Sequence, residues 1–542
     1  MKIITYFSIY QIKYNYRITM SNNKSNHLFL LIQTLSKSEK RNFKLYANRI
    51  RINKHAKFMK LFQVISKMDF YDEKKILEDT SIRKVQLSNM KSHLYKQILI
   101  SLKLQHTDNN YDIKIREYLD IAKILYNKGL YIQSLKFLGK AKIIAKIYEY
   151  NSILLELVEF EKMIESQHIT RSLHSKSGEL AVESKELIEK IQYTNALSNL
   201  SLELYGLYLK VGYVRNEKDK IFIETYFRTN IPKFDFKKLF FYEKLFLHQA
   251  QVWYHYIRQD FIMCYRSSYK WVELFKNHKK AKKIAPVSYL KGYHYLLGTL
   301  FYLNHYSKFT DVLKTFEKEV KNGEILINEN TKILIFMYTY TNRINKHYME
   351  GSFSEGVQKI IPSLLIDFKK FSNRLDYHYI MVLYYKIACL YFGSGDNLNT
   401  IRYLLKIIEN KKKNLRQDLQ CFARLLHLIA CYESGLDENM DQKIQSAYKF
   451  FIQMDDWYIV QKKIIYFFKN LGNVYPHQIK CQFKKLRDKL IKYYHHPYEK
   501  RTFLYLDIIS WLTSKIENKS IEIIIKEKFL KKKKTIIKSF FK

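Results

Sequence analysis

Apolar residues recur every three or four positions along almost the whole chain from about Asn26 onward, the spacing that puts them on one face of an α-helix. The stretch Leu35–Ile50 opens with Ser36 and Glu39, whose spacing predicts a capping box in which each side chain bonds the other residue's backbone amide. The apolar face that follows in this stretch is formed by Phe43, Tyr46, Ala47 and Ile50. The pattern therefore predicts helices and no strands.

Helical patterning continues through Lys57–Met68 and two further stretches that are separated by a break at Thr80–Ser81. Residues 25–106 are predicted to form an N-terminal helical unit. The break permits a helix-turn-helix with Lys84–Leu104 as recognition helix. The residues that could face a groove are Arg83, Lys84, Gln86, Asn89 and Lys91. Val85, Met90 and Leu94 predict instead that this helix is at least half buried, as in any helical bundle.

One pattern is written twice, 266 positions apart: "YLDIAKILYNKGLYIQSLKFLGKA" from Tyr118 and "YYKIACLYFGSGDNLNTIRYLLKI" from Tyr384. Each copy predicts two helices joined at a glycine, Gly129 or Gly395, that supplies a left-handed backbone. The small residues Ala122 and Ala388 would let the two helices approach closely. Each copy is a unit that cannot bury its apolar face alone, so neighbouring units are expected to stack on it.

Position for position, both copies resemble a tetratricopeptide repeat (TPR), which has small and large apolar residues at these places. Both depart at the end: Lys146 stands where the motif has proline, and no proline occurs near Ile407. This departure predicts longer second helices than the standard repeat has. The chain also resembles a group of uncharacterised bacterial repeat proteins, on "LSKSEKRNFKLY" and "LYKQILISL". That resemblance implies an architecture and no activity.

The predicted fold is an all-α, degenerate TPR-like α-solenoid of antiparallel helical pairs, because the other helical pairs are weaker and irregularly spaced. Residues 107–515 form the repeat array, and 516–542 form a basic C-terminal helix or tail that either caps the array or lies on an anionic membrane surface. Residues 1–24 are predicted to be a disordered leader that is not native, with Met20 as the true start.

Composition agrees with long helices, since the 542 residues include only 14 glycines and 5 prolines. The net charge of +43 would attract nucleic acid, anionic membranes or acidic proteins. Abundant Lys, Asn, Ile, Tyr and Phe also fit A/T-rich coding, which would raise lysine content without any polyanionic partner. The five scattered cysteines predict a reducing, cytoplasmic location, and no transmembrane segment is expected.

No motif for phosphate binding, metal-dependent hydrolysis or nucleophilic catalysis occurs, so no enzyme activity, cofactor or metal site is predicted. His495–His496 could ligate a metal but read better as loop histidines. The inner-face positions of the first copy are Arg116, Leu119, Lys123 and Asn127, and those of the second are Val382, Tyr385, Cys389 and Gly393. The polar residues of the first set are the candidate partner-binding residues: Arg116, Lys123 and Asn127. Since the second set is mostly apolar, a repeated clamp for a peptide carboxylate is not expected.

The function predicted from these patterns is that of a non-enzymatic helical-repeat scaffold or adaptor, which binds a protein partner on its concave face. The alternative is a nucleic-acid-associated protein that uses the N-terminal helices or the basic tail.

Overall fold

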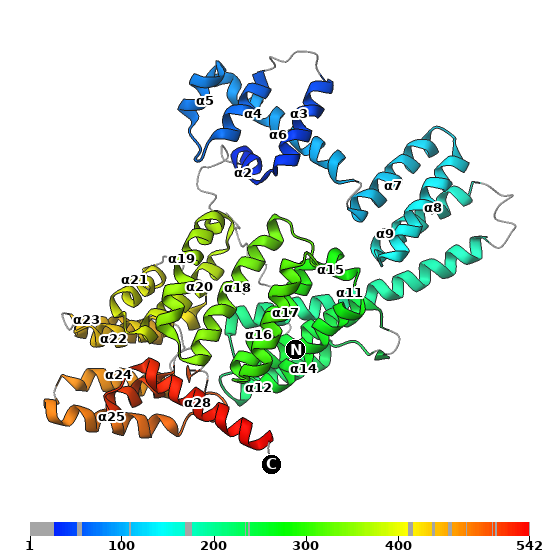
Figure 1. Ribbon diagram of the computed structural model, residues 1–542. Coiled ribbons are helices and arrows are strands. Elements are labelled where there is room, and N and C mark those ends of the chain that lie inside the picture. The colour runs from blue at the N-terminus through cyan, green and yellow to red at the C-terminus, as the bar shows by residue number, and fades with distance from the viewer. Residues whose placement is uncertain are drawn as a thin grey trace. The chain divides into compact units, whose positions relative to one another are not determined.

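The structure is a computed structural model (Figure 1), in which every regular element of the described residues is helical. The all-α prediction is therefore confirmed for this part of the chain. The described residues are 27–50, 57–107, 110–167, 176–233, 235–236, 239–409, 416–435, 439–453, 458–472, 474–500, 502–503 and 507–540. The predicted leader 1–24 and the proposed start at Met20 lie outside them.

The chain divides into two compact units, residues 1–189 and 190–542, and the division falls within helix α11. From the start of the described chain to this division, the helices are α2 (His27–Thr34), α3 (Lys37–Ile50), α4 (Lys57–Lys67), α5 (Glu73–Thr80), α6 (Lys84–His106), α7 (Tyr111–Asn127), α8 (Tyr131–Ile147), α9 (Asn151–Glu165) and α11 (Lys176–Val211). The predicted boundary at 106 coincides with the end of α6, whereas the division into compact units comes later.

Helices α2 to α6 surround one apolar core in which α4 contacts α2, α5 and α6. The predicted capping box is present at the start of α3: the Ser36 N–H donates to Glu39 Oε2 at 2.7 Å, and the Glu39 N–H donates to Ser36 Oγ at 3.2 Å. The predicted break is also present, because Ser81 has a left-handed backbone (φ 57°) that ends α5.

The prediction that Val85 belongs to the buried side of α6 is wrong. Its side chain is 90% exposed, the largest value among the exposed large apolar residues of the described chain. The buried residues of α6 are instead Leu87, Leu94, Ile98 and Ser101. Val85 lies on the opposite side of the helix from Leu87, since two residues turn an α-helix by about 200°.

The two sequence copies form equivalent helical hairpins, α7–α8 and α20–α21. Ala122 and Ala388 are both completely buried between the two helices of their hairpins. In the first, Ser134 Oγ donates to the Ala122 carbonyl at 2.8 Å; in the second, Thr400 Oγ1 lies 3.3 Å from the Ala388 carbonyl. The shared residues of the two copies therefore serve the same contacts.

The remaining helices belong to residues 190–542. They are α12 (Glu217–Asn230), α13 (Phe241–Ile257), α14 (Phe261–Asn277), α15 (Ala281–Ile284), α16 (Pro286–Tyr302), α17 (Tyr306–Lys321), α18 (Glu329–Glu350), α19 (Phe353–Phe371), η3 (Ser372–Arg374), α20 (Tyr377–Ser394), α21 (Asn397–Ile408), α22 (Gln417–Glu433), α23 (Met440–Gln453), α24 (Ile459–Leu471), α25 (Pro476–Ile491), α27 (Ile508–Glu517) and α28 (Ile521–Phe540).

Five successive hairpins in this unit each turn on a residue with positive φ. These residues are Gln259, Asn304, Gly351, Gly395 and Gly435. Their spacing of 40 to 47 residues exceeds the roughly 34 residues of a regular tetratricopeptide array. Helix α8 has 17 residues, as the missing proline predicts, but α21 has only 12, so the prediction of a longer second helix is wrong for the second copy.

The basic C-terminal helix α28 packs on α27 and on α18 and α20 (Figure 1). At Gly351 the α28 backbone comes so close that a Cβ atom would lie 2.5 Å from the Lys526 nitrogen. Lys532 Nζ donates to the Asn304 carbonyl at 2.7 Å. The helix is therefore held by the turns of two hairpins. Among the described helices, none is both long and apolar enough to cross a membrane.

Candidate functional site

A large cavity lies within residues 190–542 and has a volume of about 1180 Å³. Its wall is formed mainly by the first helix of each successive hairpin, α13, α16, α18 and α20, with part of α11. Helix α28 contributes Ile525, Lys528, Phe529, Lys532 and Lys533, so the C-terminal helix forms one side of the cavity. Each of these helices presents residues three or four positions apart, which is why one helical face supplies the wall.

Aromatic rings make up much of the lining. They are Tyr205, Tyr208, Trp253, Tyr256, Tyr295, Phe301, Tyr302, Tyr306, Tyr338, Tyr348, Tyr379, Tyr385, Tyr494, Phe503 and Phe529. Many contact one another edge to face; the Tyr295 ring centroid, for example, is 5.0 Å from that of Trp253. Interlocked rings of this kind make a rigid wall that offers apolar surface and hydroxyl groups together.

Lys386 of α20 is one of the cations of the wall. Its Nζ donates to Asn345 Oδ1 at 2.5 Å and lies 5.0 Å from the centroid of the Phe301 ring. No carboxylate is paired with it among the described residues. Burial lowers the pKa of Lys386 to about 8, because the charged ammonium loses water and gains only a neutral partner. An anionic group in the cavity would replace that lost solvation.

Two neutral histidines lie on the same wall. The His294 ring stacks on Tyr338 with centroids 4.3 Å apart, and burial lowers the pKa of both His294 and His378 to about 4. The Nδ1 atoms of both are buried and have no hydrogen-bond partner in the described part of the structure. A buried polar atom without a partner is costly, so a ligand that bonds to it gains the full interaction.

Positive charge exceeds negative charge in the lining. Its cations are Lys308, Lys386, Arg416, Lys528, Lys532 and Lys533, whereas Asp507 is the one carboxylate among the described lining residues. Asp507 lies 3.8 Å from Lys528, and Arg416 is paired with Asp418 at 2.9 Å. The remaining lysines leave the cavity cationic, so its chemistry favours a ligand with negative charge and apolar or aromatic groups.

The predicted partner-binding residues lie elsewhere, on α7. Arg116 and Lys123 line a second hollow of about 530 Å³, whereas Asn127 ends the helix and does not line it. Arg116 Nε pairs with Asp112 at 3.3 Å, and Lys123 Nζ pairs with Glu156 at 3.2 Å. The structure thus gives both cations carboxylate partners, and their role in binding stays a prediction.

The inner-face positions predicted for the second copy lie in the cavity wall, with one exception. Val382, Tyr385 and Cys389 line it, whereas Gly393 packs against Phe353. Sequence reasoning missed Lys386 as a site residue. The available signal was its place within the apolar run "YIMVLYYKIACLYFG", where a single lysine interrupts an otherwise buried helix.

Other candidate chemistry has structural explanations. His496 Nδ1 lies 3.3 Å and 3.2 Å from the backbone nitrogens of Tyr498 and Glu499, so this ring caps a turn. Across the described chain, no group of three or more His, Cys, Asp or Glu side chains is placed to hold a metal ion.

Comparisons with protein-family models, with curated proteins and with solved structures found no match to this chain.

Proposed function

We propose that this protein is a non-enzymatic helical-repeat scaffold or adaptor that holds an acidic segment of a partner protein in the cavity of residues 190–542. We also propose that its hairpins form a degenerate TPR-like solenoid whose concave face is the cavity wall. The recurring left-handed turns and the equivalent hydroxyl–carbonyl bonds of the two copies support this architecture. The observation that carries the function is an aromatic cavity in which Lys386 has no carboxylate partner among the described residues.

Two features favour a protein segment over a small molecule. The volume of about 1180 Å³ is larger than the roughly 300–1,000 Å³ of most small-molecule pockets. Thr341 of α18 also places a hydroxyl in the lining that can bond a peptide backbone, whereas the amides of Asn342 and Asn345 already bond the Tyr338 carbonyl and Lys386. An extended peptide recognised through such groups needs no chemistry from the protein.

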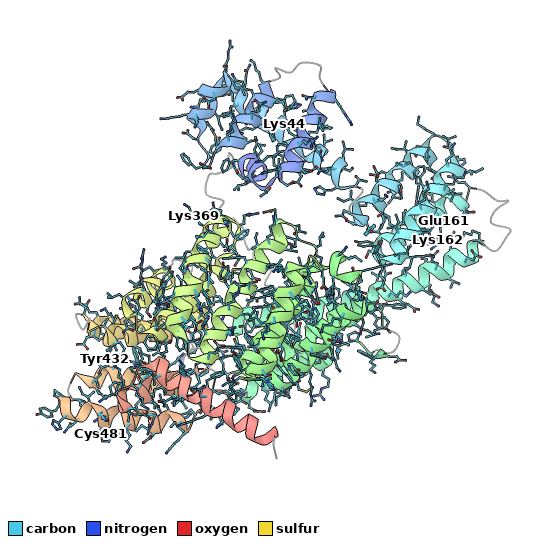
Figure 2. The ribbon with its side chains drawn as sticks, in the orientation of Figure 1. Lys44, Glu161, Lys162, Lys369, Tyr432 and Cys481 are labelled. Carbon is cyan, nitrogen blue, oxygen red and sulfur yellow. The ribbon has the colours of Figure 1, made fainter. Side chains whose placement is uncertain are left out.

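Selection of random peptides displayed on phage tests this proposal with the full-length protein. We expect enriched peptides to be rich in Asp and Glu with at least one aromatic or large apolar residue. Lys386→Glu should weaken their binding by about tenfold or more, because it places like charges together in a buried site. The matched control is Lys369→Glu, in the exposed last turn of α19 and labelled in Figure 2, which should change affinity less than twofold. Enriched peptides without acidic residues, or equal effects of both substitutions, would refute the proposal.

A further inference from the structure

Helices α5 and α6 meet in a geometry that the cavity does not explain. Three residues, Ser81 to Arg83, connect them, and the first has a left-handed backbone. A connection of three or four residues with such a residue is typical of a helix-turn-helix. Residues on both sides of the turn are buried against the core that α4 shares with α5 and α6: Ile76, Thr80, Ile82 and Leu87.

The N-terminal half of α6 is fixed in place by an ion pair and a ring contact. Lys91 Nζ pairs with Glu73 at the beginning of α5 at 3.0 Å, and the His93 ring lies edge to face with Phe58 of α4 at 5.4 Å. Further along, Tyr46 donates to Gln97 at 3.1 Å. The inner side of α6 therefore packs against the other helices, and these contacts fix which residues lie on its outer side.

That outer side is exposed along the N-terminal half of α6, and its residues are Lys84, Val85, Gln86, Ser88, Asn89 and Ser92, with Arg83 directly before the helix. Lys91, also expected to face a groove, is instead held by Glu73. The outer side combines two cations, two amides, two hydroxyls and one apolar side chain. An exposed valine at this place has no packing role in the described structure, since it is 90% accessible.

The charge of this region suits a polyanion. No acidic residue occurs from Ile82 to Thr107, and residues 27–50 and 57–107 together carry fifteen Lys and Arg against six Asp and Glu. Helix α5 is capped by the Asp72 side chain, whereas α6 has neither a capping side chain nor an acidic residue in its first turn. The exposed acidic residues Glu78 and Asp79 belong to α5.

We propose that α5 and α6 form a helix-turn-helix that binds double-stranded DNA, with the N-terminal half of α6 in the major groove. Asn89 and Gln86 are then the base-reading amides, because an Asn or Gln side chain can bond both N6 and N7 of adenine. Val85 contacts a thymine methyl group, and Arg83 and Lys84 contact phosphates. This site and the cavity of residues 190–542 are independent, so either proposal can fail alone.

Selection from a pool of duplexes with a random central segment tests the proposal with the full-length protein. We expect a recurring sequence that contains A·T pairs. Asn89→Ala should lower the affinity for the selected duplex about tenfold and leave the affinity for an unrelated duplex unchanged. The reason is that contacts to bases depend on the DNA sequence, whereas contacts to phosphates do not. Lys84→Glu should lower the affinity for both duplexes and reduce the salt dependence of binding.

Matched controls come from the same unit. Gln133→Ala and Ile132→Ala replace exposed residues of α8, and both should leave the affinity for the selected duplex within twofold. Thermal melting of each variant verifies that it is folded. The proposal is overturned if no sequence is enriched or if the enriched duplex binds Asn89→Ala and Val85→Ala as well as the original. It is also overturned if a random single-stranded RNA pool competes more strongly than the duplex. The same holds if substitutions on this face weaken binding to a protein partner and leave binding to the duplex unchanged.

Discussion

The two hairpins α7–α8 and α20–α21 are built alike and present different chemistry. Both bury an alanine between their helices and turn on a glycine with positive φ. At equivalent inner positions, however, the first has Arg116 and Lys123, which are paired with carboxylates, and the second has Val382 and Cys389 in a cavity wall. The repeated residues therefore determine how a hairpin packs, and the residues that differ determine what its inner face can bind.

The difference is sharpest at one pair of positions. Asp120 of the first hairpin is exposed and lines the second hollow, whereas its equivalent in the second hairpin is Lys386, which is enclosed by aromatic rings. The rings belong to two other helices of the stack, Phe301 to α16 and Tyr348 to α18. A charge thus becomes a recognition element where stacked neighbours remove it from water.

The largest expected effect comes from the shared alanines. Ala122→Leu and Ala388→Leu should each lower the free energy of unfolding by about 3 kcal/mol, because neither site has room for a larger side chain. Hydrogen exchange should become faster around residues 111–165 for the first variant and around 377–433 for the second. Faster exchange in both regions with either variant would mean that the two hairpins share one cooperative core.

The next largest effect is a difference in stability between the two hairpins, at equivalent positions where their first helices end. A Cβ on Gly393 would lie 2.3 Å from the buried Phe353 ring, whereas the equivalent Asn127 is exposed. We expect Gly393→Ala to cost about 2 kcal/mol, since overpacking of about 3 kcal/mol exceeds a gain of about 1 kcal/mol in helix propensity. Asn127→Ala should change stability by less than about 0.5 kcal/mol. Denaturant unfolding measures both, and Phe353→Leu should restore part of the loss.

A smaller effect of opposite sign is expected at Lys386. Removing its buried charge by Lys386→Met should raise the free energy of unfolding at pH 7 by ~1–2 kcal/mol. Between pH 8 and the ordinary lysine pKa of 10.5 the folded protein binds fewer protons than the unfolded chain, so its stability rises with pH. The advantage of the variant should accordingly shrink over this range. A difference that does not depend on pH would show that Lys386 is not buried as a cation.

The smallest effect tests the equivalent hydroxyl groups. Ser134→Ala removes a buried bond of 2.8 Å and should cost about 1 kcal/mol. Thr400→Val removes the equivalent bond to the Ala388 carbonyl, which is longer at 3.3 Å, so we expect a smaller loss of stability. Thr400 Oγ1 also bonds the Asp396 carbonyl at 2.8 Å, and the substitution removes this bond too. Thermal melting compares the two, and a larger loss for Thr400→Val would show that the bond within its own helix dominates.

Local patterns predicted the helices, the capping box and the paired hairpins because each depends on residues close together in sequence. Ala122 and Gly129, for instance, have their structural roles within one 24-residue pattern. The cavity could not be predicted in this way, because His294, Lys386 and Lys528 come from three helices that are distant in the chain. The exposure of Val85 was missed because helical spacing alone does not say which face of a helix is covered.

Neutralising the equivalent charges of the two hairpins tests the proposed binding site most directly. The measurement is the affinity of the full-length protein for a phage-selected acidic peptide, by isothermal titration calorimetry, with Lys386→Gln and Asp120→Asn. We expect Lys386→Gln to weaken binding about tenfold, the effect of losing one charge-assisted hydrogen bond, and Asp120→Asn to change it less than twofold. Unchanged affinity in Lys386→Gln, or an equal loss in both variants, would contradict binding in the cavity of residues 190–542.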